Sequence, residues 1–190
     1  MKNKILKGSA TAIIVLATVA FTDGKKEINT ETSEINWTGE KVTGSHNGTI
    51  QLESGHLMME DDKIVGGEFI MDMSTITVTD LTGENKGKLE GHLKSEDFFG
   101  IENHPKAKLL ITSAATKGDG TFGVVADLTI KEKTNPVTFD LKMEENSATT
   151  QLTIDRSKYD VRYGSGSFFD NLGDKTIYDN FQLDVNLNFR

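Results

Sequence analysis

The sequence predicts an all-β fold, an antiparallel barrel of about eight strands, from three observations. Apolar and polar residues alternate with a period of two in segment after segment between residues 35 and 189. A single interruption, between residues 80 and 104, has the spacing of a helix instead. Consecutive antiparallel strands with one apolar face each need a shared interior, and closing the sheet into a barrel removes its exposed edges.

The strand segments follow one another along the chain. The first two are marked by apolar residues at alternate positions, namely Ile35, Trp37 and Gly39, then Ile50 and Leu52. We expect Leu57 and Met59 to begin the return of a hairpin, and residues 61–63 to form the next turn. The alternation then recurs at Phe69, Met71 and Met73; Leu109 and Ile111; Phe122 to Ile130; Val137 to Leu141; and Leu152 and Ile154.

The last strand and the helical interruption complete the pattern. The final strand alternates strictly, with Phe181, Leu183, Val185, Leu187 and Phe189 on one face and polar residues on the other. In the interruption, Leu89, His92 and Leu93 fall at helical spacing, and Ser95 is a candidate N-cap for a following turn at residues 96–99.

Composition excludes several classes of protein. The chain has 190 residues, no Cys and a formal net charge of -8. A disulfide framework and a Cys-based zinc site are therefore excluded. Nucleic acid is not an expected partner, because binding phosphates requires a basic surface and this chain is acidic.

The N-terminus has the features of a secretory signal peptide. Lys2, Lys4 and Lys7 precede an apolar run at residues 10–20, which ends in the small residues Thr18 and Ala20. The run is shorter than the roughly 20 residues that a spanning helix needs. We therefore expect a signal peptide at residues 1–20, a polar lead at 21–32 and one barrel domain at 33–190. The mature protein is expected to be periplasmic or secreted, without a lipid anchor because no Cys follows the run.

Several motifs together resemble the YceI-like family of lipocalin-like, polyisoprenoid-binding barrels. The first is residues 37–48, WTGEKVTGSHNG, and the later ones are DMSTI at 72–76, Asp80-Leu81, His92-Leu93, Asp97-Phe98-Phe99, Pro105, Leu128-Thr129-Ile130 and Ile154-Asp155-Arg156. Each motif alone is weak, but their order and spacing agree from residue 33 to residue 189. The sequence departs from the family in Gly100 and in a long loop from Tyr163 to Lys175.

The resemblance implies an eight-stranded antiparallel lipocalin-like barrel with a short helical insertion around residues 82–100. It also implies a binding protein that holds the prenyl chain of a lipid, such as an isoprenoid quinone or polyprenyl phosphate, for storage or transport. The signal peptide makes this an extracytoplasmic binding protein. No cofactor is expected beyond that bound lipid. Transient membrane contact is consistent with this role, and the sequence leaves open whether the protein is a monomer or a dimer.

The apolar parity of the strands is expected to face the barrel lumen. Burying the charges of the other parity, such as Asp127, Asp140 and Asp184, would cost several kcal/mol each. The expected ligand-binding residues of the lumen are Phe69, Met71, Met73, Leu109, Ile111, Phe122, Val124, Leu128, Val137, Phe139, Ile154, Phe181, Leu183 and Val185. From the residues alone, a lumen filled by its own side chains is the alternative.

Four further residues are candidates for the barrel mouth: His46, His92, Phe99 and Arg156. Arg156 could bind a phosphate or quinone oxygen through paired donors, or could form a structural ion pair with Asp155 or another carboxylate. His46 and His92 could donate to a headgroup or bond to backbone, and Phe99 could gate one end of the barrel.

No catalytic constellation is found in the sequence, so an enzyme is not expected. The four His residues are scattered without a metal-binding spacing. Two alternatives stay open: a metal-dependent enzyme that uses His46 and His92 at the mouth, and a closed-core barrel that acts as an interaction protein. An outer-membrane barrel is disfavoured by charges on the segments around Glu68 and Lys142 and by a total of 1 Trp and 3 Tyr.

Overall fold

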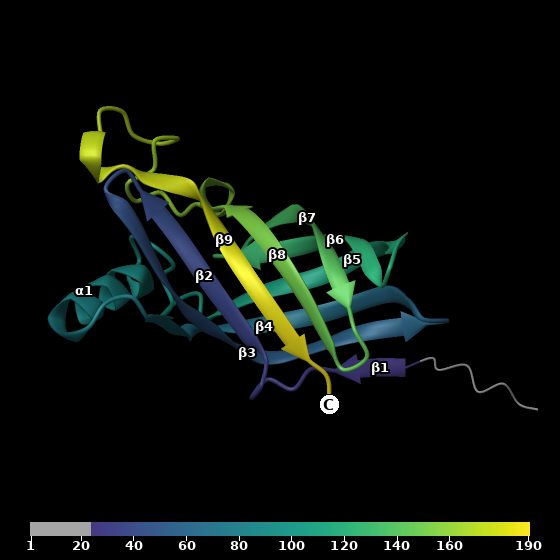
Figure 1. Ribbon diagram of the computed structural model, residues 1–190. Helices are drawn as coiled ribbons and strands as arrows, with labels where there is room; N and C mark the ends of the chain where they lie inside the picture. Colours follow the sequence, from purple (N-terminus) through teal and green to yellow (C-terminus); the bar gives the residue numbers. More distant parts are fainter. Residues whose placement is uncertain (1–23) are drawn as a thin grey trace, which may run out of the picture.

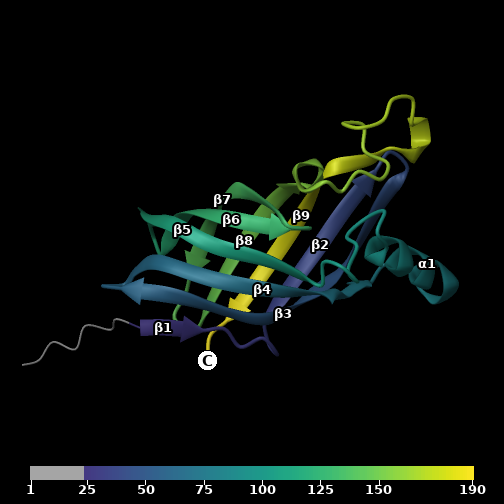
Figure 2. The same cartoon turned by 180° about the vertical axis from the view of Figure 1, so that it is seen from behind.

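The computed structural model describes residues 24–190, which form a closed antiparallel barrel (Figures 1 and 2). The sheet order is β1-β3-β2-β9-β8-β7-β6-β5-β4, and pairing of β3 with β4 closes the barrel. The strands are β1 (Gly24–Glu27), β2 (Glu34–Lys41), β3 (Gly44–Glu60), β4 (Lys63–Val78), β5 (Lys106–Gly118), β6 (Thr121–Ile130), β7 (Lys133–Met143), β8 (Ser147–Asp155) and β9 (Ile177–Asn188). The predicted barrel of eight strands, β2 to β9, is confirmed.

The N-terminal part of the described chain adds a ninth strand. β1 pairs with residues 56–59 of β3, and the side chain of Ile28 is only 2% exposed. The segment expected as a polar lead therefore contributes to the sheet. The expected signal peptide at residues 1–20 lies outside the described residues.

Strand β3 corrects one expectation. Leu57 and Met59 do not begin the return of a hairpin, because Gly44–Glu60 is one continuous strand of 17 residues. Its register against β4 shifts between Thr49 and Gln51 and again between Leu52 and Ser54. A bulge inserts an extra residue and turns the following side chains to the other face. The buried residues therefore change from even-numbered positions, such as Leu52, to odd-numbered positions, such as Leu57, within one strand. In the sequence this change looks like the end of one strand and the start of another.

Two tight turns lie where the backbone must adopt positive φ. Asp61 and Asp62, between β3 and β4, have φ of 48° and 59°, and Lys131 and Glu132, between β6 and β7, have φ of 47° and 60°. Positive φ at both central residues is the conformation of a type I′ turn, whose twist matches that of paired strands. The turn expected at residues 61–63 is thus present and fixes the register of the closing pair of strands.

The helical insertion consists of a single helix, α1 (Gly83–Lys94), followed by turns to residue 103. Glu90 joins α1 to the end of β4, since its Oε1 accepts hydrogen bonds from Thr77 Oγ1 at 2.5 Å and from the Val78 N–H at 2.9 Å. Ser95 is not an N-cap: it ends α1, and its hydroxyl donates to the His92 carbonyl at 2.8 Å. No helix within residues 24–190 is long and apolar enough to cross a bilayer.

The interior of the barrel contains two clusters of buried side chains. One, at the end that bears α1, includes Trp37, Phe98, Phe99 and Tyr159, and the other, near β1, includes Leu57 and Phe122 among others. The side chains that pack against both clusters are only partly buried, and they are Ile50, Met71, Leu109, Val137, Phe139, Leu183 and Val185. The densest packing therefore lies toward the two ends, with a looser layer between them.

Gly48 should be essential for barrel packing. A Cβ at this position would lie 1.8 Å from the Thr77 carbonyl oxygen and 2.7 Å from Cζ2 of Trp37. We expect Gly48→Ala to destabilise the fold by about 3 kcal/mol, because backbone must move to admit the methyl group. Urea unfolding measures the change. Gly66→Ala is the control, since its Cβ would meet nothing closer than 3.9 Å, and equal stability of the two variants would contradict the prediction.

Candidate functional site

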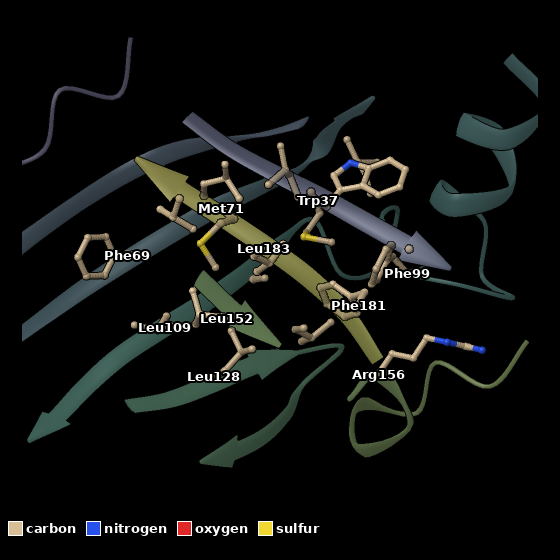
Figure 3. A pocket seen from close by; sticks show the side chains of 18 of the residues that line it. Trp37, Phe69, Met71, Phe99, Leu109, Leu128, Leu152, Arg156, Phe181 and Leu183 are labelled. Carbon is tan, nitrogen blue, oxygen red and sulfur yellow. The ribbon is translucent and has the colours of Figure 1, made fainter. Parts of the chain in front are cut away.

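A cavity of about 170 Å³ lies inside the barrel (Figure 3). Side chains from all eight barrel strands, from α1 and from the segment after it surround this space. Apart from Thr150 and Arg156, the lining is apolar or aromatic or is glycine. Such a surface favours an apolar ligand, because it offers almost no hydrogen-bonding groups to compete with water.

Most of the residues expected to line the lumen do so. The cavity is bordered by Phe69, Met71, Met73, Leu109, Ile111, Leu128, Phe139, Phe181, Leu183 and Val185. Figure 3 shows Phe69 and Met71 of β4, Leu109 of β5 and Leu183 of β9 directed into the same space. Residues that alternate along separate strands are thus brought together because the sheet closes on itself.

Four expected lumen residues do not border the cavity. Phe122 and Val124 are 7% and 1% exposed in the cluster near β1, and Ile154 is 1% exposed in the cluster near α1. Val137 is half-buried and packs against both clusters. These side chains point inward but lie at other heights along the barrel axis. Alternation along a strand predicts that a side chain faces inward, but it does not predict the height at which the side chain lies.

Of the 28 residues that border the cavity, 16 were not among the expected site residues, and two of these, Trp37 and Gly39, shape its open space. Trp37, the single Trp of the chain, is 9% exposed, and Gly39 follows it on the inward parity of β2. A Cβ built on Gly39 would have no neighbour within 4 Å. The signal in the sequence was the alternation Ile35, Trp37, Gly39, in which the inward position after Trp37 carries no side chain.

The size of the cavity limits what it holds without rearrangement. A protein cavity of about 150 Å³ is large enough to bind benzene. The space here is therefore comparable to one isoprene unit of five carbons, rather than to a long prenyl chain. A longer ligand requires side chains to move, and Met71 and Met73 are suited to this because their unbranched side chains adapt their shape.

Arg156 lies at one end of the cavity and is held by backbone carbonyls. Its side chain is 2% exposed, and its nitrogens donate to the carbonyls of Val161 at 2.7 Å, Ile177 at 3.0 Å and Tyr178 at 3.2 Å. Asp179 Oδ1 lies 3.5 Å from its Nη2. Burial lowers the pKa of Arg156, and Asp179 and Asp155 oppose that shift.

These contacts give Arg156 a structural role. It joins η1 (Arg156–Tyr159) to the start of β9, and its guanidinium also lies over the ring of Phe98, 5.4 Å from the centroid. Asp155 is not its direct partner, because the Asp155 carboxylate accepts from the Ser157 N–H at 3.0 Å and so caps η1. Few donors remain for a ligand headgroup, since three are directed at carbonyls.

The other three candidates for the mouth are in different places. His92 and Phe99 lie at the end of the barrel that holds Arg156, whereas His46 lies elsewhere. Phe99 borders the cavity, and its ring meets that of Phe98 edge-on at 5.0 Å. His92 packs against Phe98 at 5.4 Å and Tyr163 at 4.3 Å, and its buried Nε2 has no hydrogen-bond partner. His46 pairs instead with Asp80 at 2.8 Å and is absent from the cavity lining.

The two histidines therefore have separate surroundings. Within residues 24–190, no group of three or more His, Cys, Asp or Glu side chains is arranged to hold a metal ion. The arrangement gives no support to the alternative of a metal-dependent enzyme built on His46 and His92.

Exposed aromatic side chains gather beside the same end of the barrel. Those of Tyr163, Phe168, Phe169 and Tyr178 are 40–50% exposed, and we refer to these four as the aromatic rim. Gly164 connects this loop to β9 through its carbonyl, which accepts from the Ile177 N–H at 2.8 Å. Tyr178 belongs both to the rim and to the cavity lining, so the rim is continuous with the site.

A closed antiparallel barrel of eight strands around an apolar cavity is a lipocalin-like architecture. A sequence model of the YceI-like domain matches residues 27–189, and the chain therefore belongs to the YceI-like family. The resemblance found in its motifs is thus confirmed.

Curated relatives carry the designation UPF0312 protein. The chain is 30% identical over 92 residues to one from Pseudomonas putida, a match that spans 48% of this chain and 46% of the relative, or about half its length. It is 30% identical over 145 residues to one from Staphylococcus aureus strain USA300, spanning 63% of this chain and 80% of the relative.

Solved structures share the fold at low sequence identity. Burkholderia cenocepacia BcnA has a TM-score of 0.68 at 18% identity, with 84% of this chain and 98% of that chain covered. A polyisoprenoid binding domain from Saccharophagus degradans, described as implicated in plant cell wall breakdown, has a TM-score of 0.62 at 14% identity, with 86% and 97% covered. At such identities the likeness concerns the fold.

The half-buried position of His92 predicts a pH-dependent stability. Burial lowers the pKa of His92, Arg156 also lowers it, and Asp97 opposes the shift. Because the folded pKa lies below the ordinary value of 6.5, the unfolded chain binds the proton more tightly. This contribution to stability is complete above pH 6.5 and is lost as the pH falls through 6.5 toward the folded pKa.

We expect His92→Phe to reduce the loss of melting temperature between about pH 7.5 and pH 5.5, since Phe keeps an aromatic ring against Phe98 and Tyr163 without titrating. Thermal unfolding followed by circular dichroism measures both slopes. A variant whose melting temperature falls as steeply as that of the unsubstituted protein would contradict the assignment.

Proposed function

We propose that this protein is an extracytoplasmic binding protein, rather than an enzyme, that holds the prenyl chain of a polyisoprenoid lipid in its barrel. The observation that carries the proposal is the apolar cavity, which is bordered by every barrel strand and has almost no polar lining. The fold shared with a structure described as a polyisoprenoid binding domain supports the same ligand class. The signal-like N-terminus supports a periplasmic or secreted location.

The energetics favour exchange with a membrane over irreversible capture. Each isoprene unit gains up to about 3 to 4 kcal/mol when it leaves water for an apolar interior. Lipid tails are as apolar as the cavity, so transfer from a bilayer into the barrel gains almost nothing from hydrophobicity. The protein would then act as a shuttle or store, and the fit of the chain would decide which lipid it holds.

The headgroup of the lipid would remain near the aromatic rim. Arg156 uses three donors on backbone carbonyls, and the rest of the lining at that end is aromatic or apolar. A quinone ring or a phosphate therefore finds better hydration outside the barrel, next to Tyr178 and the loop that follows residue 160.

Filling the cavity should abolish ligand binding without unfolding the protein. Gly39→Leu places a side chain where a Cβ has no neighbour within 4 Å, so it should occupy the cavity at little cost in stability. We expect solvent extraction and mass spectrometry to find a prenyl lipid in the gently purified protein and at least about tenfold less in the variant, because the lost space excludes the chain.

Thr38→Leu is the matched control. It places the same leucine side chain at the neighbouring position of β2, which faces outward. Repeated absence of lipid from the purified protein, together with no uptake of added isoprenoid quinone or polyprenyl phosphate, would overturn the proposal. That result would favour the closed-core barrel instead.

The aromatic rim should mediate contact with lipid surfaces. Aromatic side chains are favoured at the membrane interface, and two half-exposed rings contribute about 1 to 2 kcal/mol when they leave water. Phe168→Ser with Phe169→Ser should therefore weaken binding to phosphatidylcholine vesicles by about tenfold. Flotation of the protein with such vesicles measures the change.

The control pair is Met58→Ser with Val65→Ser, which removes side chains that are 42% and 52% exposed at the far β3–β4 hairpin. Equal weakening by the two pairs would show that vesicle binding depends on general surface hydrophobicity and would contradict a role for the rim.

A further inference from the structure

The barrel wall has one weak seam, between β7 and β8. These strands are neighbours in the sheet, but they pair only at Leu141–Thr150, Lys142–Thr149 and Met143–Ala148, next to the turn that joins them. By contrast, β6 and β7 form ten residue pairs, and β8 and β9 form nine. Away from the turn, residues 134–140 and 151–155 therefore face each other without a ladder of backbone hydrogen bonds.

The backbone groups along this break can be assigned from the geometry of the β6–β7 hairpin. In a two-residue hairpin the closing pair, here Ile130 and Lys133, exchanges backbone hydrogen bonds, and the direction of these groups then alternates along the strand. Pro136 and Thr138 consequently direct their backbone groups away from β6, toward β8. Pro136 has no N–H to offer on that side, as is typical of a strand edge.

Only side chains bridge the break. Thr150 Oγ1 donates to the Asp140 carbonyl at 2.7 Å, and Asn135 Nδ2 donates to the Lys158 carbonyl of η1 at 2.9 Å. A protein hydrogen bond contributes about 1 kcal/mol, so opening the break costs one such bond between β7 and β8 and one between β7 and η1. Separation at β6–β7 or β8–β9 would break a full ladder.

The break also lies directly over the cavity. The break and the cavity are both bordered by Phe139 and Leu141 of β7 and by Thr150 and Leu152 of β8. Val137 stays half-buried although it does not line the cavity, whereas inward residues of the neighbouring β6 such as Val124 and Leu128 are buried. The ends of the barrel are better closed, one by Phe98, Phe99 and Arg156 and the other by the cluster that includes Leu57 and Phe122.

We infer that the prenyl chain enters and leaves the barrel sideways, through the β7–β8 seam, which opens when side chains and the unpaired strand edges separate. This inference rests on the proposed function, since it describes the route to the same cavity. It accounts for how a long chain reaches an interior whose ends are filled, and it requires no rupture of the hydrogen-bonded wall.

Cross-linking the seam tests this route. The chain contains no Cys, so a pair introduced at Thr138→Cys and Thr153→Cys can be joined in the folded protein by a short bismaleimide. Both side chains are exposed, and continuing the register from Leu141–Thr150 places them opposite each other. Val125→Cys with Thr138→Cys is the control, because those residues are already paired between β6 and β7.

Uptake is followed with a quinone that carries two isoprene units, through quenching of Trp37, the single Trp, which lines the cavity. We expect the seam cross-link to slow uptake at least about tenfold with the final degree of quenching unchanged, because the chain must then pass through a wall with more hydrogen bonds to break. The control cross-link and both unlinked pairs should take up the quinone at the original rate.

An unchanged rate in the cross-linked seam, or equal slowing by the control cross-link, would overturn the lateral route and leave the proposed function standing. No quenching by the unsubstituted protein would overturn the proposed function, and the route with it. Thermal unfolding of each linked form, compared with its unlinked form, verifies that the fold is intact.

Discussion

Closure of the sheet between β3 and β4 is the constraint on which the cavity depends. These are the longest strands, and their ladder contains three register shifts that allow them to bend around the barrel. Without this pairing, the apolar parity of each strand would face solvent instead of a common interior. The bulges also explain why the inward parity changes within β3, so that one strand borders the cavity with Leu52 and buries Leu57 near β1.

Given a closed wall, the cavity results from where the bulky side chains lie along the barrel axis. Aromatic residues, among them Phe98 and Phe99, fill the end that bears α1 together with Arg156. Another group of aliphatic and aromatic residues fills the opposite end. Gly39 leaves unoccupied space at the level of Phe181, its partner in β9. The interior is therefore packed at its ends and open in the middle.

Electrostatics reinforces this division between wall and interior. Arg156 is the one charged side chain that is buried among residues 24–190, and its burial is balanced by three carbonyls and Asp179. Ion pairs such as Lys106–Glu53 and Lys117–Asp140 lie on the outer surface, where solvent screens them and their contribution is small. The acidic charge of the chain thus accompanies the outward parity, and the cavity stays free of it.

The lumen expected from sequence alternation shows how far local pattern reaches. Phe69, Phe139 and Leu183 border the cavity as expected, because parity along a strand decides which face a side chain takes. Phe122 and Ile154 share that parity but fill the core, because their height in the barrel depends on strand stagger. Arg156 could be singled out by its motif, but its carbonyl partners come from segments that are distant in sequence.

The sequence by itself determined the all-β class, the inward face of the regular strands, the turn at Asp61–Asp62 and the family, because each depends on residues that are near one another in the chain. Only the tertiary structure decided which inward residues enclose space and that Gly39 leaves room beside Trp37. It also decided that the pairing of β7 with β8 ends at Leu141–Thr150. These features depend on stagger and on pairing between strands. Hydrophobic periodicity fixes the face of a side chain but not its level along the barrel axis.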